Sequence, residues 1–386
     1  MANPNLVIYN YGFAGPVGAN PSPRQDLPAP DATASGGGAA VLEVAGVLEF
    51  ADNRTYSLSI DNELIQGTAS AEAAIQGRDG FRPYVRLTSS QSVDPGAANL
   101  TPEPGAPRSF RIEGLWLGSA NTTSSFIVER APASNATTLD WDQITIRETT
   151  LDPGGVRADK SMIPPLNLVI KGRVRTLRIE RAIVGAIRVF THPTDCSLSG
   201  LVENLIISDS IVDGIQSGGV ALDCPTGRVT LSGVTLLGDL KAVLVQASNC
   251  LVLGQVDILN QELSCFRFTA TSKPAPDSSL PRTFHTPRSA PSPTDPEGAI
   301  IDVKPVFFTS LRFGDPGYAE LSLAAPPEIV TGAENGSELG SFSFLRRPIA
   351  LRSVQTKVDE FKPAGVIAQY IFEGEHPAAA LPAKVF

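Results

Sequence analysis

The sequence predicts an all-β protein that folds as a right-handed parallel β-helix, a solenoid of stacked coils. Three observations predict it: a recurring strand–bend–strand pattern, a further strand after most copies, and outward charges that alternate in sign. The 386-residue chain is 42% hydrophobic and 18% charged, so it can bury a large core. We expect an N-terminal arm (1–40), the β-helix (41–325) and a C-terminal helix–strand unit (326–386) that caps or docks.

The pattern is clearest in VTLSGVTLLG (229–238), where apolar residues stand at the first, third, sixth and eighth places. Period two on either side of a three-residue step indicates two short strands joined by a bend. Matching stretches are FRIEGLWL, ITIRETTL, LRIERAIV, LIISDSIV and LVLGQVDI, beginning at 110, 144, 177, 205 and 251. Such spacing is typical of solenoid coils, and the leucine-rich frame L-x-x-L-x-L-x-x-N is not found. Stacked coils would place Ile179, Ile207 and Leu231 in one interior file.

A third strand is expected after most copies, which gives each coil three strands and three turns. The candidates are SFIVE (125–129), AIRVF (186–190), GVALD (219–223), AVLVQ (242–246) and CFRFT (265–269). Glycines such as Gly214 and Gly238 suit the turns, because glycine adopts positive φ at little cost.

Outward positions support the stacking. Two columns alternate in sign, as a lateral ion-pair ladder would: Glu113, Arg147, Glu180; and Glu148, Arg181, Asp209. Other outward positions are apolar: Trp116, Ile183, Ile206, Ile211 and Val252. We expect a chain terminus or a partner to cover these apolar positions.

The two ends differ from the repeat. Residues 14–40 read as an extended arm, and strands begin in 41–60. A Pro-rich loop is expected at 273–296, where the prolines argue against ladder strands. Leu351, Val354, Val358 and Phe361 step by three, four and three, which predicts one face of a helix. A strand is expected at 366–372. The helix would either cap the open end of the solenoid or dock elsewhere.

Composition argues against several functions. The formal net charge is −9 and there is no basic block, so nucleic acid is not expected as a partner. We find no secretory signal and no run of about 18 apolar residues that could span a membrane, which predicts a cytoplasmic protein. The four cysteines form no C-x-x-C pair and only three histidines occur, so no metal and no cofactor are expected.

Five stretches resemble a family of bacterial right-handed parallel β-helix proteins associated with gene clusters for phage-tail-like contractile injection particles, near baseplate components. They are YNYGF (9–13), VLEFADNRTY (47–56), SLRFGDPGYAELS (310–322), GAENGSELGSFSFLRRP (332–348) and LRSVQTKVDEFKPAG (351–365). The resemblance implies a non-enzymatic structural protein that assembles in the cytoplasm with other particle or baseplate proteins. Where Leu339 stands, a Met is common in the family, and many members are longer. The family offers no catalytic motif to carry over.

β-Helices also include polysaccharide lyases and hydrolases, which need converging acids on one outer face. The candidate catalytic residues are Asp209, Asp213 and Asp223, with Arg181 and Arg188 one coil earlier. The structural interpretation is favoured, because Asp209 fits the ion-pair column and Asp213 precedes a turn glycine. A polysaccharide-binding or polysaccharide-cleaving protein, with surface carbohydrate as its ligand, remains the alternative.

Candidates for partner docking are the apolar helix positions and two outward residues of the repeat: Leu351, Val354, Val358, Phe361, Trp116 and Ile211. The oligomeric state stays open between a monomer and a trimer. A surface adhesin is a third hypothesis, and it would require an export route that the N-terminus does not show.

Overall fold

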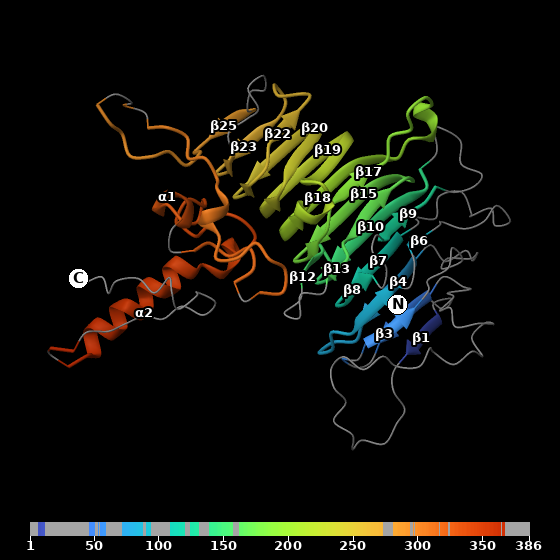
Figure 1. The fold of residues 1–386 in the computed structure, drawn as a ribbon, viewed down its shortest axis with the longest axis horizontal. Helices are drawn as coiled ribbons and strands as arrows, with labels where there is room; N and C mark the ends of the chain where they lie inside the picture. The colour runs from blue at the N-terminus through green and yellow to red at the C-terminus, as the bar shows by residue number, and fades with distance from the viewer. Residues whose placement is uncertain are drawn as a thin grey trace, which may run out of the picture.

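The computed structural model places the strands in three long parallel stacks that wind as a β-helix (Figure 1). The structure describes residues 7–11, 46–50, 53, 55–58, 72–87, 90–93, 109–119, 124–130, 139–156, 162–272, 281–293, 296, 298–315, 317–322, 325–363 and 365–366. Within them, strands pair in parallel from coil to coil, with one antiparallel hairpin, β12 (Gly155–Val156) with β13 (Met162–Ile163). The predicted fold class is confirmed.

We call the first stack sheet A. It contains β1 (Val7–Tyr11), β2 (Gly46–Phe50), β4 (Glu72–Gly77), β7 (Ser109–Glu113), β10 (Trp141–Arg147), β15 (Arg173–Glu180), β23 (Cys265–Arg267) and β25 (Arg282–Phe284). Parts of three longer strands complete it: β18 (Leu201–Asp213), β19 (Val220–Leu237) and β20 (Asp239–Ser248). Ile179 pairs with Ile207, and Ile207 pairs with Leu231. All three are at most 1% exposed, so the predicted interior file is confirmed.

Sheet B follows sheet A in the described coils from β2 to β24. It contains β3 (Thr55–Leu58), β5 (Tyr84–Leu87), β8 (Trp116–Ser119), β11 (Thr150–Leu151), β16 (Ile183–Val184), β21 (Leu251–Val252), β24 (Ala270–Thr271) and the ends of β18 and β19. Sheet C closes each coil. It contains β6 (Gln91–Val93), β9 (Ser124–Val128), β14 (Leu166–Ile170), β17 (Ile187–Val189), β22 (Val256–Ile258) and the starts of β19 and β20. The inward apolar residues of the three sheets form one continuous core.

The sequence pattern assigned the strands of the last coils to the wrong sheets. Leu244–Ser248 pairs with Arg228–Ser232 in sheet A, and β23 continues that stack, although both stretches were predicted as third strands. LVLGQVDI therefore supplies β21 and β22 rather than sheet A. Val252 is buried in the interior instead of facing outward. Strands of all three sheets alternate inward apolar residues with outward ones. Periodicity alone therefore cannot tell which sheet a short strand joins.

Two predicted irregular segments contain strands of the ladder. Residues 7–11, inside the predicted arm, form β1 and pair residue by residue with β2. β25 lies within the predicted Pro-rich loop and pairs in parallel with β23. The three residues of β25 contain no proline, so the flanking prolines do not interrupt its ladder. Residues 1–6 and 12–40 of the predicted arm, and 367–372 of the predicted terminal strand, lie outside the described residues.

The described parts of residues 301–346 form what we call the lateral layer, which packs against the outer face of sheet B. It contains three short helices: η4 (Pro305–Phe307), α1 (Pro327–Val330) and η5 (Ser343–Leu345). Helix α2 (Arg347–Phe361) follows the layer. Ile211, Leu237 and Leu251 are buried under it with Tyr318 and Ile329. The C-terminal segment thus covers the flank of the solenoid.

The backbone of the lateral layer lies close to the solenoid at Gly340 and Ser341. At Gly340, φ is +91° and an added Cβ would lie 2.4 Å from Thr235 Oγ1. The Gly340 N–H donates to the Asn249 carbonyl at 2.9 Å, and the Ser341 N–H donates to Thr235 Oγ1 at 3.0 Å. Only glycine allows this approach at this backbone angle.

Helix α2 projects away from the strands beyond α1 (Figure 1). The predicted helix is confirmed, and Pro348 lies in its first turn. Within the described residues, Arg347 holds the start of α2 on the lateral layer: it pairs with Glu320 and lies over the Phe342 ring.

Candidate functional site

In the seven coils from β7 to β23, the bend between sheets A and B is made by a single residue with left-handed backbone angles, whereas the coil of β4 and β5 turns through residues 78–83. We call this file the bend column: Gly114, Glu148, Arg181, Asp209, Gly233, Asn249 and Phe268, with φ from 44° to 69°. This explains the three-residue step in the sequence pattern, because one left-handed residue turns the chain between two extended segments. Glycine and asparagine tolerate this conformation, whereas the longer side chains adopt it at a cost.

Small polar residues hold the bend from the inside. The residue after the bend is Thr149, Ser210, Cys250 or Thr269 in four coils. Each side chain donates to the backbone carbonyl two residues earlier, at 2.8, 2.6, 3.1 and 2.8 Å respectively. All four are buried. These hydrogen bonds satisfy buried polar groups where the strand ladder is interrupted.

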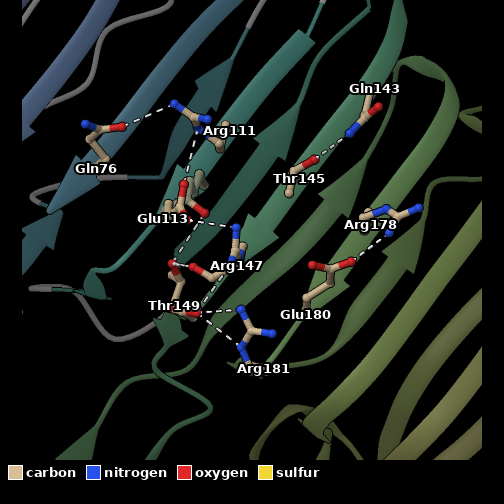
Figure 2. Close-up of polar contacts among 12 residues, drawn as sticks. Gln76, Arg111, Glu113, Gln143, Thr145, Arg147, Thr149, Arg178, Glu180 and Arg181 are labelled. Carbon is tan, nitrogen blue, oxygen red and sulfur yellow. Dashed lines mark hydrogen bonds and ion pairs between the residues drawn. The ribbon is translucent and has the colours of Figure 1, made fainter. Parts of the chain in front are cut away.

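Charged side chains gather on the outer face of sheet A beside the bend column (Figure 2). Glu113, Arg147 and Glu180 occupy one register position on neighbouring strands, as predicted. Arg147 lies 3.5 Å from Glu113, and Arg178 lies 2.7 Å from Glu180. In the second column, Arg181 lies 2.5 Å from Glu148. Both predicted columns are therefore stacked.

These pairs determine the charge states of the face. The hydrogen bond from Arg181 lowers the pKa of Glu148, so this carboxylate is ionised at neutral pH and is a poor proton donor. Burial raises the pKa of Asp209, partly opposed by the charge of Arg181. The arrangement neutralises acids with arginines rather than presenting two unequal carboxyl groups to a substrate.

The structure separates the proposed catalytic acids. Asp209 lies at the bend, while Asp213 is buried under the lateral layer. Asp213 accepts hydrogen bonds from the Tyr318 hydroxyl at 2.7 Å and from the Ile215 N–H at 2.8 Å. Burial raises the pKa of Asp213.

The third acid, Asp223, belongs to sheet C. It stands in register between Arg188 and Lys241, in a column that continues to Asp257. This is another alternation of sign between coils. Arg188 itself donates to the Ser217 carbonyl. The three acids therefore do not converge, and the residues around them serve the stack and the layer.

Two of the predicted docking residues contact other parts of the chain itself. Ile211 is 4% exposed beneath the lateral layer. The Trp116 ring lies 4.9 Å from the Tyr84 ring and 6.1 Å from the Phe313 ring, and its indole N–H donates to Asp152. The expectation that a terminus covers the outward apolar residues is thus met at Ile211, whereas Trp116 remains 37% exposed and is covered by Phe313 only in part.

The other docking candidates lie together on α2, well away from the bend column. Val354 is 52% and Phe361 is 76% exposed, and Val358 is partly exposed. Leu351 stands in the helix one turn before Val354 and two turns before Val358. Ile349, Phe344 and Leu345 at the start of the helix are also exposed. The α2 region is therefore the most apolar exposed part of the described C-terminal segment.

Residues that hold the lateral layer were missed from the sequence. Asn249 accepts the Glu334 N–H, and Arg267 lies 2.6 Å from Glu334. Glu338 is buried, and this burial raises its pKa to about 7. Its Oε1 lies 3.9 Å from Arg347 Nε, beyond hydrogen-bond distance. The outward apolar residues of the repeat were the available signal that something covers sheet B.

No family model, curated protein or solved structure matches this chain. Among the described residues, no three His, Cys, Asp or Glu side chains are grouped so that they could hold a metal ion. The described helices are also too short or too polar to span a membrane.

Proposed function

We propose that this chain is a non-catalytic structural protein that docks through α2 to a partner in a phage-tail-like contractile injection particle. The observation that carries the docking is the exposed apolar face of α2 on a helix that projects from a well-packed body. The particle setting follows from the sequence resemblance.

The body supports a structural role. Its strands are paired from coil to coil, and its interior is a continuous apolar core. In the coils from β4 to β22, each coil contacts its neighbours along three sheets, as in other solenoids built from stacked repeats. The neutralised acids of the outer face fit a stacked scaffold better than a hydrolytic centre.

Deletion of residues 347–386 tests the docking. This cut leaves Gly340 and Ser341 on sheet B. It takes from the lateral layer the contacts of Arg347, whose pair with Glu320 is partly exposed and contributes little to stability. We expect particles to lose the truncated protein while its β-sheet circular dichroism and unfolding cooperativity stay close to those of the full chain. Retention of the truncated protein on purified particles at full-length levels would refute docking through α2.

Polysaccharide binding is the second candidate function, favoured by the polar face of Figure 2. Gln76, Gln143 and Thr145 lie among the charged pairs on adjoining strands, and such groups can hydrogen-bond sugar hydroxyls. A polysaccharide panel, scored both for binding and for released reducing ends, tests it. Binding abolished by Gln143→Ala would favour this function over the structural one.

A further inference from the structure

Helix α2 carries a narrow apolar stripe with basic residues beside it. Val354, Val358 and Phe361 follow Leu351 at steps of three and four, which is the seam used by helices that pack on other helices. From helical periodicity, Lys357 lies on one side of the stripe and Lys362 on the other.

The charge of this segment is opposite to that of the chain. Residues 346–362 contain five basic residues (Arg346, Arg347, Arg352, Lys357, Lys362) and two acidic ones (Asp359, Glu360), a net +3. The whole chain carries −9, so the remainder carries −12. Lys362 pairs with Asp359 at 2.6 Å, but both side chains are exposed, and such a pair is weak enough to be exchanged for a partner's carboxylate.

We infer that α2 inserts into an apolar groove of a partner protein whose rim carries carboxylates. This inference rests on the proposed docking function and specifies the chemistry of the partner. Apolar anchors at i, i+3, i+7 and i+10 match the helix-in-groove mode of recognition. Acidic groups on the rim would lie opposite Lys357 and Lys362 and would also favour encounter with the positively charged helix.

Two other surfaces fit less well. Helices that lie on membranes expose a broad apolar face and keep acids away from anionic lipid, whereas this stripe is narrow and Asp359 and Glu360 lie on the same helix. In a pair of α2 helices from two copies, the flanking lysines would oppose each other, because these positions meet across a helix–helix seam.

A designed probe tests the groove directly. It is a covalently linked pair of helices with Leu at the groove positions and Glu along both rims, and its matched counterpart has Lys along both rims. We expect the full chain to bind the Glu-rimmed probe at least about tenfold more tightly than the Lys-rimmed probe, with the preference weakened by salt. Val354→Asp should abolish binding to both.

Charge variants distinguish the two lysines beside the apolar stripe from the other charges of α2. The double variant Lys357→Glu/Lys362→Glu should lose the preference for the Glu-rimmed probe or reverse it. Glu360→Lys, which changes charge on the face away from the stripe, should keep the preference. Circular dichroism of each variant checks that α2 remains helical.

Three outcomes would overturn the inference. One is equal binding, or no binding, of the two probes by a chain whose α2 is helical. Another is co-sedimentation with phosphatidylglycerol vesicles that is lost in Val354→Asp, which would assign the stripe to a membrane. The last is a dimer, detected by light scattering, that the substitution Val354→Asp dissociates. This result would assign the apolar stripe to contact with a second copy of the chain. In each of these cases, the particles could still fail to retain the protein that lacks residues 347–386. Docking through α2 would then stand, and only the groove chemistry would fail.

Discussion

A buried carboxyl group connects the lateral layer with α2. Glu338 is 4% exposed, and removal from water disfavours its charged form more than the nearby Arg347 favours it. Glu320, the other acid facing Arg347, disfavours the charged form further. The pKa of Glu338 therefore rises from 4.5 to about 7.

The shift predicts a loss of stability on the alkaline side. Between pH 4.5 and 7 the folded chain holds a proton on Glu338 that the unfolded chain releases, so stability falls as pH rises through this window. The contribution is fully present below pH 4.5 and is lost above the folded pKa, a difference of roughly 3 kcal/mol.

Denaturant unfolding of the wild type and Glu338→Gln across pH 4 to 9 measures this contribution. The glutamine variant should lack this part of the pH dependence and should gain stability relative to the wild type as pH rises. Glu338→Ala should lack the slope too, while its missing side-chain contacts lower its stability at every pH. Parallel curves for the wild type and Glu338→Gln would contradict the assignment.

At the scale of elements, the bend column shows how a short local conformation builds a long stack. The coils from β7 to β23 turn between sheets A and B at one left-handed residue, and two of these positions carry Glu148 and Arg181. Their ion pair joins neighbouring coils, but both side chains are more than a third exposed. Such a pair contributes about 0–1 kcal/mol, comparable to the backbone cost of holding a non-glycine residue there.

The comparison of two substitutions at Arg181 separates these effects. Arg181→Ala and Arg181→Gly both remove the ion pair, but only alanine keeps the backbone strain. We expect the glycine variant to be more stable than the alanine variant by about 1 kcal/mol in urea unfolding. At Arg178, an outward position inside β15, the order should be reversed because glycine weakens a strand interior. An alanine variant at 181 that equals or exceeds the glycine variant would disprove the strain.

At the scale of the whole molecule, the lateral layer makes the outer face of sheet B part of the interior. Ile211, Leu237 and Leu251 are apolar, and they are buried only because residues 301–346 lie over them. Tyr318 also satisfies the buried carboxyl group of Asp213. Removal of the layer would therefore expose both an apolar patch and a polar group adapted to burial.

Two truncations should consequently behave differently. A chain that lacks residues 301–386 should aggregate and bind a hydrophobic dye, because the face of sheet B is exposed. A chain that lacks residues 347–386 should remain soluble with little dye binding, since Ile329 and Tyr318 still cover that face. Size-exclusion chromatography and dye fluorescence compare the two, and equal dye binding by both would show that the layer does not protect the solenoid.

The sequence alone was sufficient for the fold class, the interior file and the two charge columns. These depend on alternation within a strand and on the repetition of a short unit, both of which are local properties of the chain. The helix of α2 was predicted for the same reason, from steps of three and four.

Only the tertiary structure decided which sheet the late strands join and what covers sheet B. Leu244–Ser248 and β21 alternate in the same way as any other strand, and their partners are chosen by contacts with residues of other coils. Asp213 is a turn residue in the sequence, yet Tyr318, 105 positions later, makes it part of a buried contact. Local pattern determines conformation, whereas burial is a property of segments that meet only after the chain has folded.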